Sequence, residues 1–280
     1  MSAAAGPPGT LREREACLYA RLRSFPSLIV AYSGGVDSAY LAWAAADVLG
    51  ERALAVTADS PSSPERHRSM ALAVAQQFGL RHEFIVTTEL ERPEYRANAP
   101  DRCYHCKHEL YVHLTRLAAD RGVAAVGDGS NADDRGDYRP GRRAAREFGV
   151  ISPLDEAGLS KDDIRTLSRE AGLPTWDEPA SACLSSRIPY HSEVNEEKLR
   201  AIETSEDALR ALGFRILRVR HHGELARIEV AQSELPRLLD ARTAAAADRA
   251  VRAAGFKYVA VDLRGYRLGS LNEGLALTPV

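Results

Sequence analysis

Residues 27–50 read SLIVAYSGGVDSAYLAWAAADVLG, and this stretch decides the fold. It opens with a short apolar run, 27–32, whose β-branched Ile29 and Val30 favour a buried strand. A glycine-rich turn follows, and the Ala- and Leu-rich segment after the turn favours a helix that ends at Gly50. The sequence therefore predicts a strand, a tight turn and a helix in direct succession.

The turn between this strand and this helix has the composition of a phosphate-binding loop. Adjacent glycines let the backbone approach a phosphate closely, and the start of the next helix offers unpaired N–H donors and a favourable dipole. Asp37 can help hold a Mg²⁺ ion that bridges phosphates, although the lysine of a Walker loop is missing. The alternative is a Gly-Gly turn in which Ser38 caps the helix. The predicted loop residues are Ser33, Gly34, Gly35, Val36, Asp37 and Ser38.

The same strand and helix pattern recurs on both sides of this unit. Apolar runs at 53–60, 82–88 and 122–129 alternate with helical segments, and a capping-box spacing at Thr10 and Glu13 begins a helix before the first strand. Apolar strands that alternate with helices predict an α/β fold with a doubly wound parallel sheet, covered on both faces.

The pattern changes near residue 190, which predicts a second domain. A long helix at 193–212, strands at 216–222 and 225–230, a helix at about 233–254 and a strand at 257–263 form a smaller α/β layer. The expected division is an N-terminal tail and helix at 1–26, a nucleotide-binding domain at 27–188 and a C-terminal α/β domain at 189–280.

Composition bounds the classes of function. The 280 residues are 45% hydrophobic and 27% charged, and no apolar run approaches the roughly 18 residues of a membrane span. The 37 basic and 39 acidic residues, with a pI near 6.5, provide no global field for nucleic acid, which makes an RNA substrate unlikely. The start, MSAAAGPPGT, lacks the pattern of a secretion signal, so we expect a cytoplasmic protein.

Four cysteines suggest metal or sulfur chemistry. Cys103 and Cys106 are spaced to share one face of a predicted helix, and Cys183 follows 77 residues later. Three thiolates can hold a [4Fe-4S] cluster with one iron open to a further ligand such as sulfide. The alternatives are a zinc site completed by His105 or His108, and buried thiols without chemistry. We interpret Cys17 as a small core residue.

Arginines form the second polar cluster. Arg218 and Arg220 alternate with Val219 on a predicted strand and so share one face, and Arg187 follows the Cys183 segment. Guanidinium groups bind phosphate oxygens in pairs, whereas the alternative is a solvated strand face. Lys107 and the Arg142-Arg143 pair have no assigned role, and a solvated surface is their default interpretation.

The hexapeptide SGGVDS resembles the signature of the PP-loop ATP pyrophosphatases, an adenine nucleotide alpha hydrolase-like superfamily, and the resemblance covers about the first 180 residues. It implies that ATP is cleaved to AMP and pyrophosphate while a substrate is adenylated. It would also place Asp59 and Ser60 near the adenosine, although a turn is nearly as good an interpretation. Asp128 could serve ATP or Mg²⁺, or be a turn residue.

The strings SGGVDS, RCYHCK, DYRPG, SACLSSRIPY and RVRHHGELARIE together resemble the LarE family of sulfur transferases along nearly the whole chain. That resemblance implies adenylation of pyridinium-3,5-biscarboxylic acid mononucleotide and its conversion to a thiocarboxylate for the nickel-pincer cofactor of lactate racemase. It implies a phosphate pocket of Ser186, Glu206, Arg218 and Arg220, beside Arg187. It also implies a homo-oligomer. His191 departs from the family, in which we expect glycine.

Two sulfur chemistries occur in this family. In one, the cysteine at the position of Cys183 gives up its own sulfur and becomes dehydroalanine. In the other, three cysteines hold a [4Fe-4S] cluster that carries a replaceable sulfide. The presence of Cys103 and Cys106 favours the cluster form. Besides the cluster, the family resemblance implies that the protein binds ATP, Mg²⁺ and a small nucleotide substrate.

Three rival functions remain at this stage. A tRNA-thiolating PP-loop enzyme can also pair this loop with cluster cysteines, but it needs a basic surface that the charge balance does not indicate. An amidotransferase-like synthetase would leave the cysteines incidental. A catalytically silent nucleotide-binding or nickel-delivery protein would release no pyrophosphate.

Overall fold

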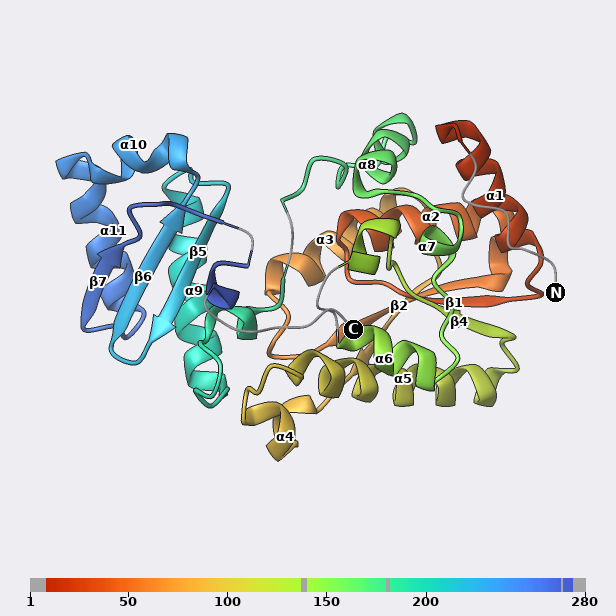
Figure 1. Ribbon diagram of the computed structural model, residues 1–280, viewed down its shortest axis with the longest axis horizontal. Helices are drawn as coiled ribbons and strands as arrows, with labels where there is room; N and C mark the ends of the chain where they lie inside the picture. Colours follow the sequence, from red (N-terminus) through yellow and green to blue (C-terminus); the bar gives the residue numbers. More distant parts are fainter. Residues whose placement is uncertain (1–8, 137–139, 180–181, 268, 274–280) are drawn as a thin grey trace. The chain divides into compact units, whose positions relative to one another are not determined.

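The computed structural model describes residues 9–136, 140–179, 182–267 and 269–273, which form two compact units (Figure 1). Unit 1 contains the described residues of 9–89 and 103–179. Unit 2 contains residues 90–102 together with the described residues from 182 onward. This division differs from the expected one, because 182–188 and the short segment 90–102 both belong with the C-terminal part.

Unit 1 is built on a four-stranded parallel sheet with strand order β3-β2-β1-β4. The predicted strands are all present, although β4 is shorter than expected. An isolated parallel bridge between Gly127 and Ile151 extends the edge beyond β4. The strands are β1 (Leu28–Ala31), β2 (Ala53–Asp59), β3 (His82–Val86) and β4 (Ala125–Gly127).

Helices connect the strands of unit 1. Both capping boxes in the sequence are formed, by Thr10 with Glu13 and by Ser160 with Asp163. The helical elements are α1 (Leu11–Arg23), α2 (Val36–Leu49), η1 (Gly50–Arg52), α3 (Glu65–Gln77), η2 (Glu89–Glu91), α5 (Arg102–Arg121), η3 (Ala132–Gly136), α6 (Gly141–Glu147), α7 (Pro153–Glu156) and α8 (Lys161–Glu170), where η denotes a 3₁₀ helix and the ends of η2 and α5 reach into unit 2.

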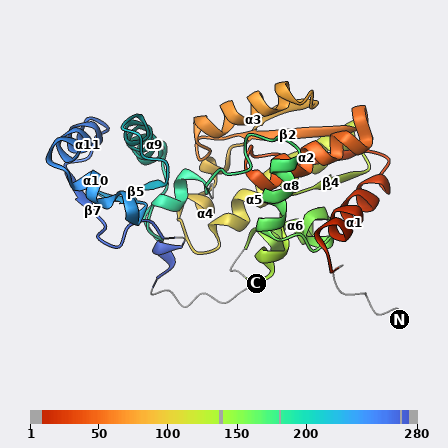
Figure 2. The same ribbon diagram turned by 90° about the horizontal axis from the view of Figure 1, so that it is seen from above.

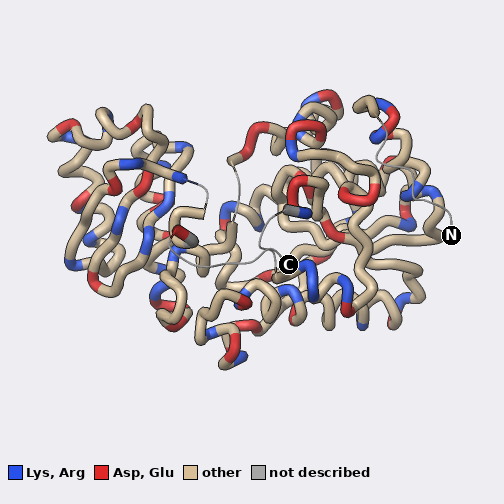
Figure 3. Tube along the Cα trace, viewed as in Figure 1, with Lys and Arg blue, Asp and Glu red and all other residues tan. Residues whose placement is uncertain are grey.

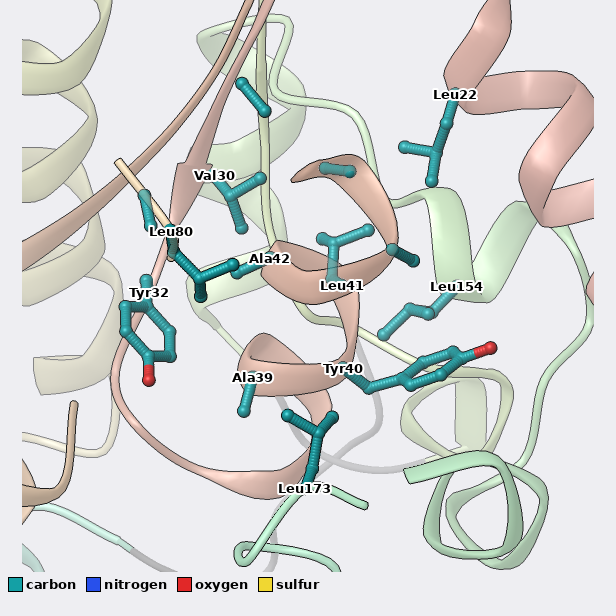
Figure 4. Close-up of a cluster of buried hydrophobic side chains, with 14 of the residues drawn as sticks. Leu22, Val30, Tyr32, Ala39, Tyr40, Leu41, Ala42, Leu80, Leu154 and Leu173 are labelled. Atoms are coloured by element: carbon teal, nitrogen blue, oxygen red, sulfur yellow. The ribbon is translucent and has the colours of Figure 1, made fainter. Parts of the chain in front are cut away.

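The sheet is buried on both faces, as a doubly wound fold requires. Alternate residues of β1 point to opposite sides, so Val30 packs with α1, α2, α3 and α8, whereas Ile29 packs with α5 and α6. Figure 1 shows α1, α2 and α8 on one side of the strands and α5 and α6 on the other, and Figure 2 shows the same unit from above. In the first cluster Leu41 and Leu154 are fully buried together (Figure 4). Each such leucine contributes about 1.5–3 kcal/mol by burial, so this face anchors α2 firmly behind the glycine-rich loop.

The topology places the loop at the carboxyl edge of the sheet. The chain leaves β1 through Ser33–Ser38, then adds β2 and β3 on one side of β1 before it returns to form β4 on the other. The strand order therefore reverses between β1 and β4, where open α/β sheets bind their ligands. The turns after β1 and β4 accordingly border the candidate site.

Unit 2 has a three-stranded sheet with order β5-β6-β7. The central strand β6 is antiparallel to β5 and parallel to β7. Its core joins these strands to α9 and α11. The single helix expected at about 233–254 is divided, because Asp240 ends α10 and caps α11 through the N–H groups of Arg242 and Thr243. Its elements are α4 (Pro93–Arg96), η4 (Leu184–Arg187), α9 (Glu196–Ala211), β5 (Leu217–His222), β6 (Leu225–Val230), η5 (Gln232–Glu234), α10 (Leu235–Leu239), α11 (Ala241–Ala253), β7 (Tyr258–Val261) and η6 (Ser270–Asn272).

Within the described ranges, every helix is too short or too polar to cross a membrane.

Candidate functional site

The first glycine of the loop is required by its surroundings. Gly34 has a φ of 75°, and a Cβ there would lie 2.8 Å from the backbone oxygen of His67 and 3.1 Å from Ala71. Both neighbours belong to α3, whose backbone cannot easily retreat. Gly35, in contrast, has no positive φ, and a Cβ there would come no nearer than 3.5 Å to the hydroxyl of Ser33. Gly34 is therefore the residue that allows the loop to close against α3.

Two serine hydroxyls hold the loop in shape. The N–H of Ser33 donates to Oγ of Ser38 at 3.1 Å, the two hydroxyls lie 3.0 Å apart, and Ser38 donates to the carbonyl of Gly35 at 3.1 Å. Helix α2 has no side chain that caps its N-terminus, so its first N–H groups, from Val36 onward, are left for a ligand. The capping alternative for Ser38 thus does not hold, because its hydroxyl closes the loop instead.

Asp37 lies at the start of α2, and only one of its two carboxylate oxygens has a hydrogen-bond partner. Its Oδ2 accepts from Nζ of Lys161 at 2.6 Å, whereas Oδ1 is buried with no hydrogen-bond partner. A buried carboxylate oxygen without a donor is costly unless a cation or a water binds it, so this oxygen fits a Mg²⁺ ligand. Lys161, at the start of α8, brings a cation to the loop. Sequence reasoning missed Lys161, because Ser160 before it signals only a helix start.

The turn after β4 packs directly on this loop. A Cβ at Gly129 would lie 2.9 Å from the backbone nitrogen of Ser38, so only glycine fits there. Asp128 before it is buried and accepts hydrogen bonds from Tyr111, Ser130 and Ser152 at 2.7–3.1 Å. These contacts are those of a carboxylate that fixes a turn, which favours the turn interpretation of Asp128 over a Mg²⁺ ligand.

The two residues at the end of β2 each interact with a neighbouring side chain. Asp59 pairs with Arg68 at 2.9 Å and remains partly exposed. Ser60 is buried and hydrogen-bonds to Ser62 and to the buried carboxylate of Glu89. Asp59 thus stays accessible to a ligand at this edge, whereas the hydroxyl of Ser60 shapes the loop that leads into α3.

The CxxC pair lies in the first turns of α5. Cys103 is exposed and Cys106 is partly exposed, and neither forms a disulfide. A Cβ at Gly141 would lie 2.9 Å from Cγ of Lys107, so the glycine of DYRPG lets α6 pack against α5 beside these cysteines. Asp137, Tyr138 and Arg139 of that string lie outside the described residues.

The solvated surface expected for the basic residues near the CxxC pair holds for Arg143, which is exposed, whereas Lys107 and Arg142 are only partly exposed. The ammonium of Lys107 lies 5.4 Å from the ring centroid of Tyr111. Arg142 pairs with Asp155 at 2.7 Å, and the guanidinium of Arg143 lies 3.8 Å from the ring centroid of Tyr104. The contact of Arg143 with Tyr104 joins α6 to α5, and the ion pair of Arg142 with Asp155 joins α6 to α7.

The remaining cysteines lie elsewhere. Cys183 belongs to unit 2 and is a partly exposed free thiol, immediately before η4. Cys17 is exposed on α1, so its interpretation as a core residue was wrong. In the part of the chain that the structure describes, no three His, Cys, Asp or Glu side chains lie together in a group that could hold a metal ion. The CxxC pair and Cys183 are thus distributed over the two units.

A buried ion pair anchors η4 to α9. Arg187 donates to both oxygens of Glu206 at 2.9 and 3.1 Å, and both side chains are almost fully buried. Burial acts to raise the pKa of Glu206, but Arg187, Arg218 and Arg210 outweigh it and lower this pKa to about 2. Arg187 also donates to the carbonyls of Ala182 and Cys183. It therefore holds the backbone around Cys183.

Arg218 and Arg220 lie beside this pair, as the alternation predicts, but their surroundings differ. Arg220 donates to Glu229 at 2.8 and 3.0 Å, to the carbonyl of Ser186 and to Ser270. Arg218 is buried, donates to the carbonyl of Leu217 and lies over the ring of Tyr266. Burial, followed by the charge of Arg187, lowers the pKa of Arg218 to about 10.

The cluster as a whole carries excess buried positive charge. Among its buried side chains, three arginines at 187, 218 and 220 face two glutamates at 206 and 229. Guanidinium groups bind phosphate oxygens in pairs, and three of them are buried together here, which makes the cluster a candidate phosphate site. Sequence reasoning missed Glu229, although its alternation with Arg227 on the neighbouring strand could have indicated it. The structure also brings Ser186 into this cluster through its carbonyl.

His191 has the backbone conformation that glycine prefers. Its φ is 64°, in the left-handed region, and its N–H donates to the carbonyl of Asn98 at 3.0 Å. The glycine expected from the family resemblance is thus explained by backbone geometry. The structure gives His191 no contact that would assign it to a ligand.

Comparisons with known proteins agree with this picture. Residues 13–98 match the NAD synthase family. An uncharacterised protein of Synechocystis sp. is 45% identical over 247 residues, which are 88% of this chain and 92% of that protein. The pyridinium-3,5-bisthiocarboxylic acid mononucleotide synthase of Lactiplantibacillus plantarum is 36% identical over 267 residues, 95% of this chain and 96% of that protein. An uncharacterised protein of Methanocaldococcus jannaschii is 30% identical over 240 residues, 86% of this chain and 90% of that protein.

Proposed function

Since the chain belongs to the LarE family of ATP-dependent sulfur transferases with a PP-loop, we propose that it acts on pyridinium-3,5-biscarboxylic acid mononucleotide. The relative from L. plantarum is named for the bisthiocarboxylic product of this substrate. The proposed reaction has two halves. In the first a substrate carboxylate is adenylated, and in the second the adenylate is replaced by sulfur.

The first half uses the PP-loop. A carboxylate oxygen attacks the α-phosphorus of ATP, the bond to the β-phosphate oxygen breaks, and pyrophosphate leaves with Mg²⁺. The unpaired N–H groups at the start of α2 and the hydroxyl of Ser33 would bind the pyrophosphate oxygens. Lys161 would add positive charge where negative charge develops on the leaving group. Asp59, partly exposed at the end of β2, would face the adenosine.

The observation that carries this proposal is the carboxylate of Asp37. One oxygen is paired with Lys161 and the other is buried without a donor, directly at a glycine-closed loop. Mg²⁺ binds proteins through one or two carboxylates together with substrate phosphates. Asp37 is thus the residue that would hold the metal against the pyrophosphate.

The second half uses the cysteines. A sulfur nucleophile attacks the acyl carbon, AMP leaves, and a thiocarboxylate results. We assign Cys103, Cys106 and Cys183 as ligands of a [4Fe-4S] cluster, because none of the three forms a disulfide and all three are at least partly exposed. Such a cluster, when bound, supplies a replaceable sulfide. A sacrificial Cys183 without a cluster is the second candidate, and the partly exposed thiol before η4 supports it equally.

The arginine cluster of unit 2 would bind the phosphate of the mononucleotide. Burial, followed by the charge of Arg187, lowers the pKa of Arg218 to about 10, and a phosphate beside it would offset both effects, so we expect Arg218 to contact the phosphate. Arg187 is paired with Glu206, and Arg220 is paired with Glu229. These side chains would shape the pocket together with Ser186, whose carbonyl accepts from Arg220. The product would serve the nickel-pincer cofactor of lactate racemase, made in the cytoplasm by a homo-oligomer of this chain.

The test follows both halves with the whole protein. With ATP, Mg²⁺, sulfide and the mononucleotide, anaerobically purified protein should form AMP, pyrophosphate and a thiocarboxylate. Asp37→Asn should reduce pyrophosphate release at least about 100-fold, because the amide lacks the charge that holds Mg²⁺. Ser69→Ala, an exposed position on α3, is the control and should be unchanged. Pyrophosphate release that does not depend on the mononucleotide, or is normal in Asp37→Asn, would overturn the proposal.

A further inference from the structure

We propose that Tyr95, Asn98 and Arg102 form a clasp that positions the Cys183 thiol for sulfur transfer, a role that rests on the proposed function. All three come from residues 90–102, the segment between β3 and α5 that belongs to unit 2 although its flanks belong to unit 1. The clasp holds residues 185–192, which directly follow Cys183.

Asn98 binds the far end of this loop. It is fully buried, and its Nδ2 donates to the carbonyls of Ile188, Pro189 and Ser192 at 3.3, 2.8 and 3.0 Å. Its own carbonyl accepts from the N–H of His191. Asn98 has a φ of 54°, a conformation that asparagine tolerates better than most residues. One side chain therefore satisfies three loop carbonyls that would otherwise be buried or left to water.

Tyr95 and Arg102 bind the near end, two residues from Cys183. The hydroxyl of Tyr95 lies 2.6 Å from Oγ of Ser185, and both side chains are fully buried. Arg102 donates to the carbonyl of Ser185 at 2.9 Å and also to Oδ1 of Asn98. The three clasp residues are thus linked to one another and to both ends of the loop.

The opposite side of the loop is fixed from within unit 2. The carbonyl of Cys183 accepts from the N–H and hydroxyl of Ser186 and from Arg187, which is itself held by Glu206. Its backbone is thus restrained on two sides, whereas the thiol is partly exposed. A partly exposed thiol beside a hydrogen-bonded backbone carbonyl is the arrangement expected of a reactive side chain on a rigid support.

The chain connects the clasp to the other thiols. Arg102 directly precedes Cys103, so the residue that binds the Cys183 loop also leads into the CxxC pair. The clasp residues belong to unit 2 and hydrogen-bond to residues 185–192 there, whereas the PP-loop belongs to unit 1. The clasp is therefore expected to act on the second half of the reaction and not on the first.

The experiment separates the two halves in a single turnover, because pyrophosphate leaves before sulfur attacks. Asn98→Asp keeps the size and backbone preference of the residue but turns an oxygen toward the three carbonyls. Tyr95→Phe removes one hydroxyl and is the milder variant. Arg96→Ala is the matched control, since Arg96 lies on the same segment in an exposed ion pair with Glu193.

We expect thiocarboxylate formation to fall about 10- to 100-fold in Asn98→Asp and less in Tyr95→Phe, because a misplacement of about 1 Å can cost 100-fold. Pyrophosphate release should stay within about threefold, and Arg96→Ala should match the wild type in both. Equal losses of both activities, or normal sulfur transfer in both clasp variants, would overturn the clasp. Wild-type protein that releases no pyrophosphate would instead refute the proposed function.

Discussion

The two glycines of the PP-loop differ in what the surrounding backbone requires of them. Gly34 has a positive φ and lies against α3, whereas Gly35 has an ordinary φ and room for a methyl group. The loop therefore depends on one glycine for closure, and on the other only for the approach of a phosphate. This difference follows from packing, and the Gly-Gly sequence alone does not reveal it.

The residue-scale prediction compares these glycines. Gly34→Ala should lower ATP affinity at least about 10-fold, because the methyl group meets the backbone of His67 and forces the loop open. Gly35→Ala should retain most of the affinity. Calorimetric titration with ATP and Mg²⁺ measures both, and melting temperatures report whether either variant is unfolded. Equal losses in two folded variants would contradict the assignment of loop closure to Gly34.

Glycine spacing and hydroxyl content predicted this loop because both are local properties of the sequence. Lys161 could not be predicted in the same way, since it is 124 residues from Asp37 and the pair exists only once α8 packs against α2. For Asp128 the sequence position suggested a ligand-binding role, whereas the structure favours a structural one. Its position after a strand is typical of a ligand-binding residue, and only its hydrogen bonds to Tyr111 and Ser152 indicate a structural role.

At the scale of elements, the buried arginines of η4 and β5 pair with glutamates of α9 and β6. The period of two along β5 predicted that Arg218 and Arg220 share a face, and the structure confirms it. It could not predict that Arg220 would be paired with Glu229 of β6, or Arg187 with Glu206 of α9. Those pairings depend on the register of a hairpin and on how a helix crosses it, which distant segments decide.

The element-scale prediction contrasts two arginines in this cluster. Arg218→Met keeps the volume and removes a charge that the surroundings disfavour, so the melting temperature should stay or rise while mononucleotide affinity falls about 10-fold or more. Arg187→Met leaves Glu206 buried without its bidentate partner and should destabilise the protein by about 3–5 kcal/mol. Calorimetry and thermal unfolding measure the two effects. Undiminished substrate binding by a stable Arg218→Met protein would contradict the phosphate assignment.

The whole molecule distributes its chemistry over two units. Lys and Arg are interspersed with Asp and Glu along both of them, in agreement with the near-neutral net charge of −2 (Figure 3). Unit 1 carries the nucleotide loop and the CxxC pair, and unit 2 carries Cys183 and the arginine cluster. Under the proposed function, either of the two sulfur chemistries would use residues of both units.

The last prediction separates these chemistries by counting thiols. If Cys103, Cys106 and Cys183 hold a cluster together, each single Ser variant should lose the iron, because two thiolates bind it poorly. The wild type should then form several products per chain when sulfide is supplied, with its mass unchanged. If Cys183 is sacrificed instead, only Cys183→Ser should eliminate product, and turnover should stop near one per chain. The mass of the polypeptide would then fall by about 34 Da as cysteine becomes dehydroalanine. Cys17→Ser, an exposed thiol on α1, is the control in every assay. Intact mass spectrometry before and after one reaction decides the question, and a loss of about 34 Da would overturn the cluster assignment.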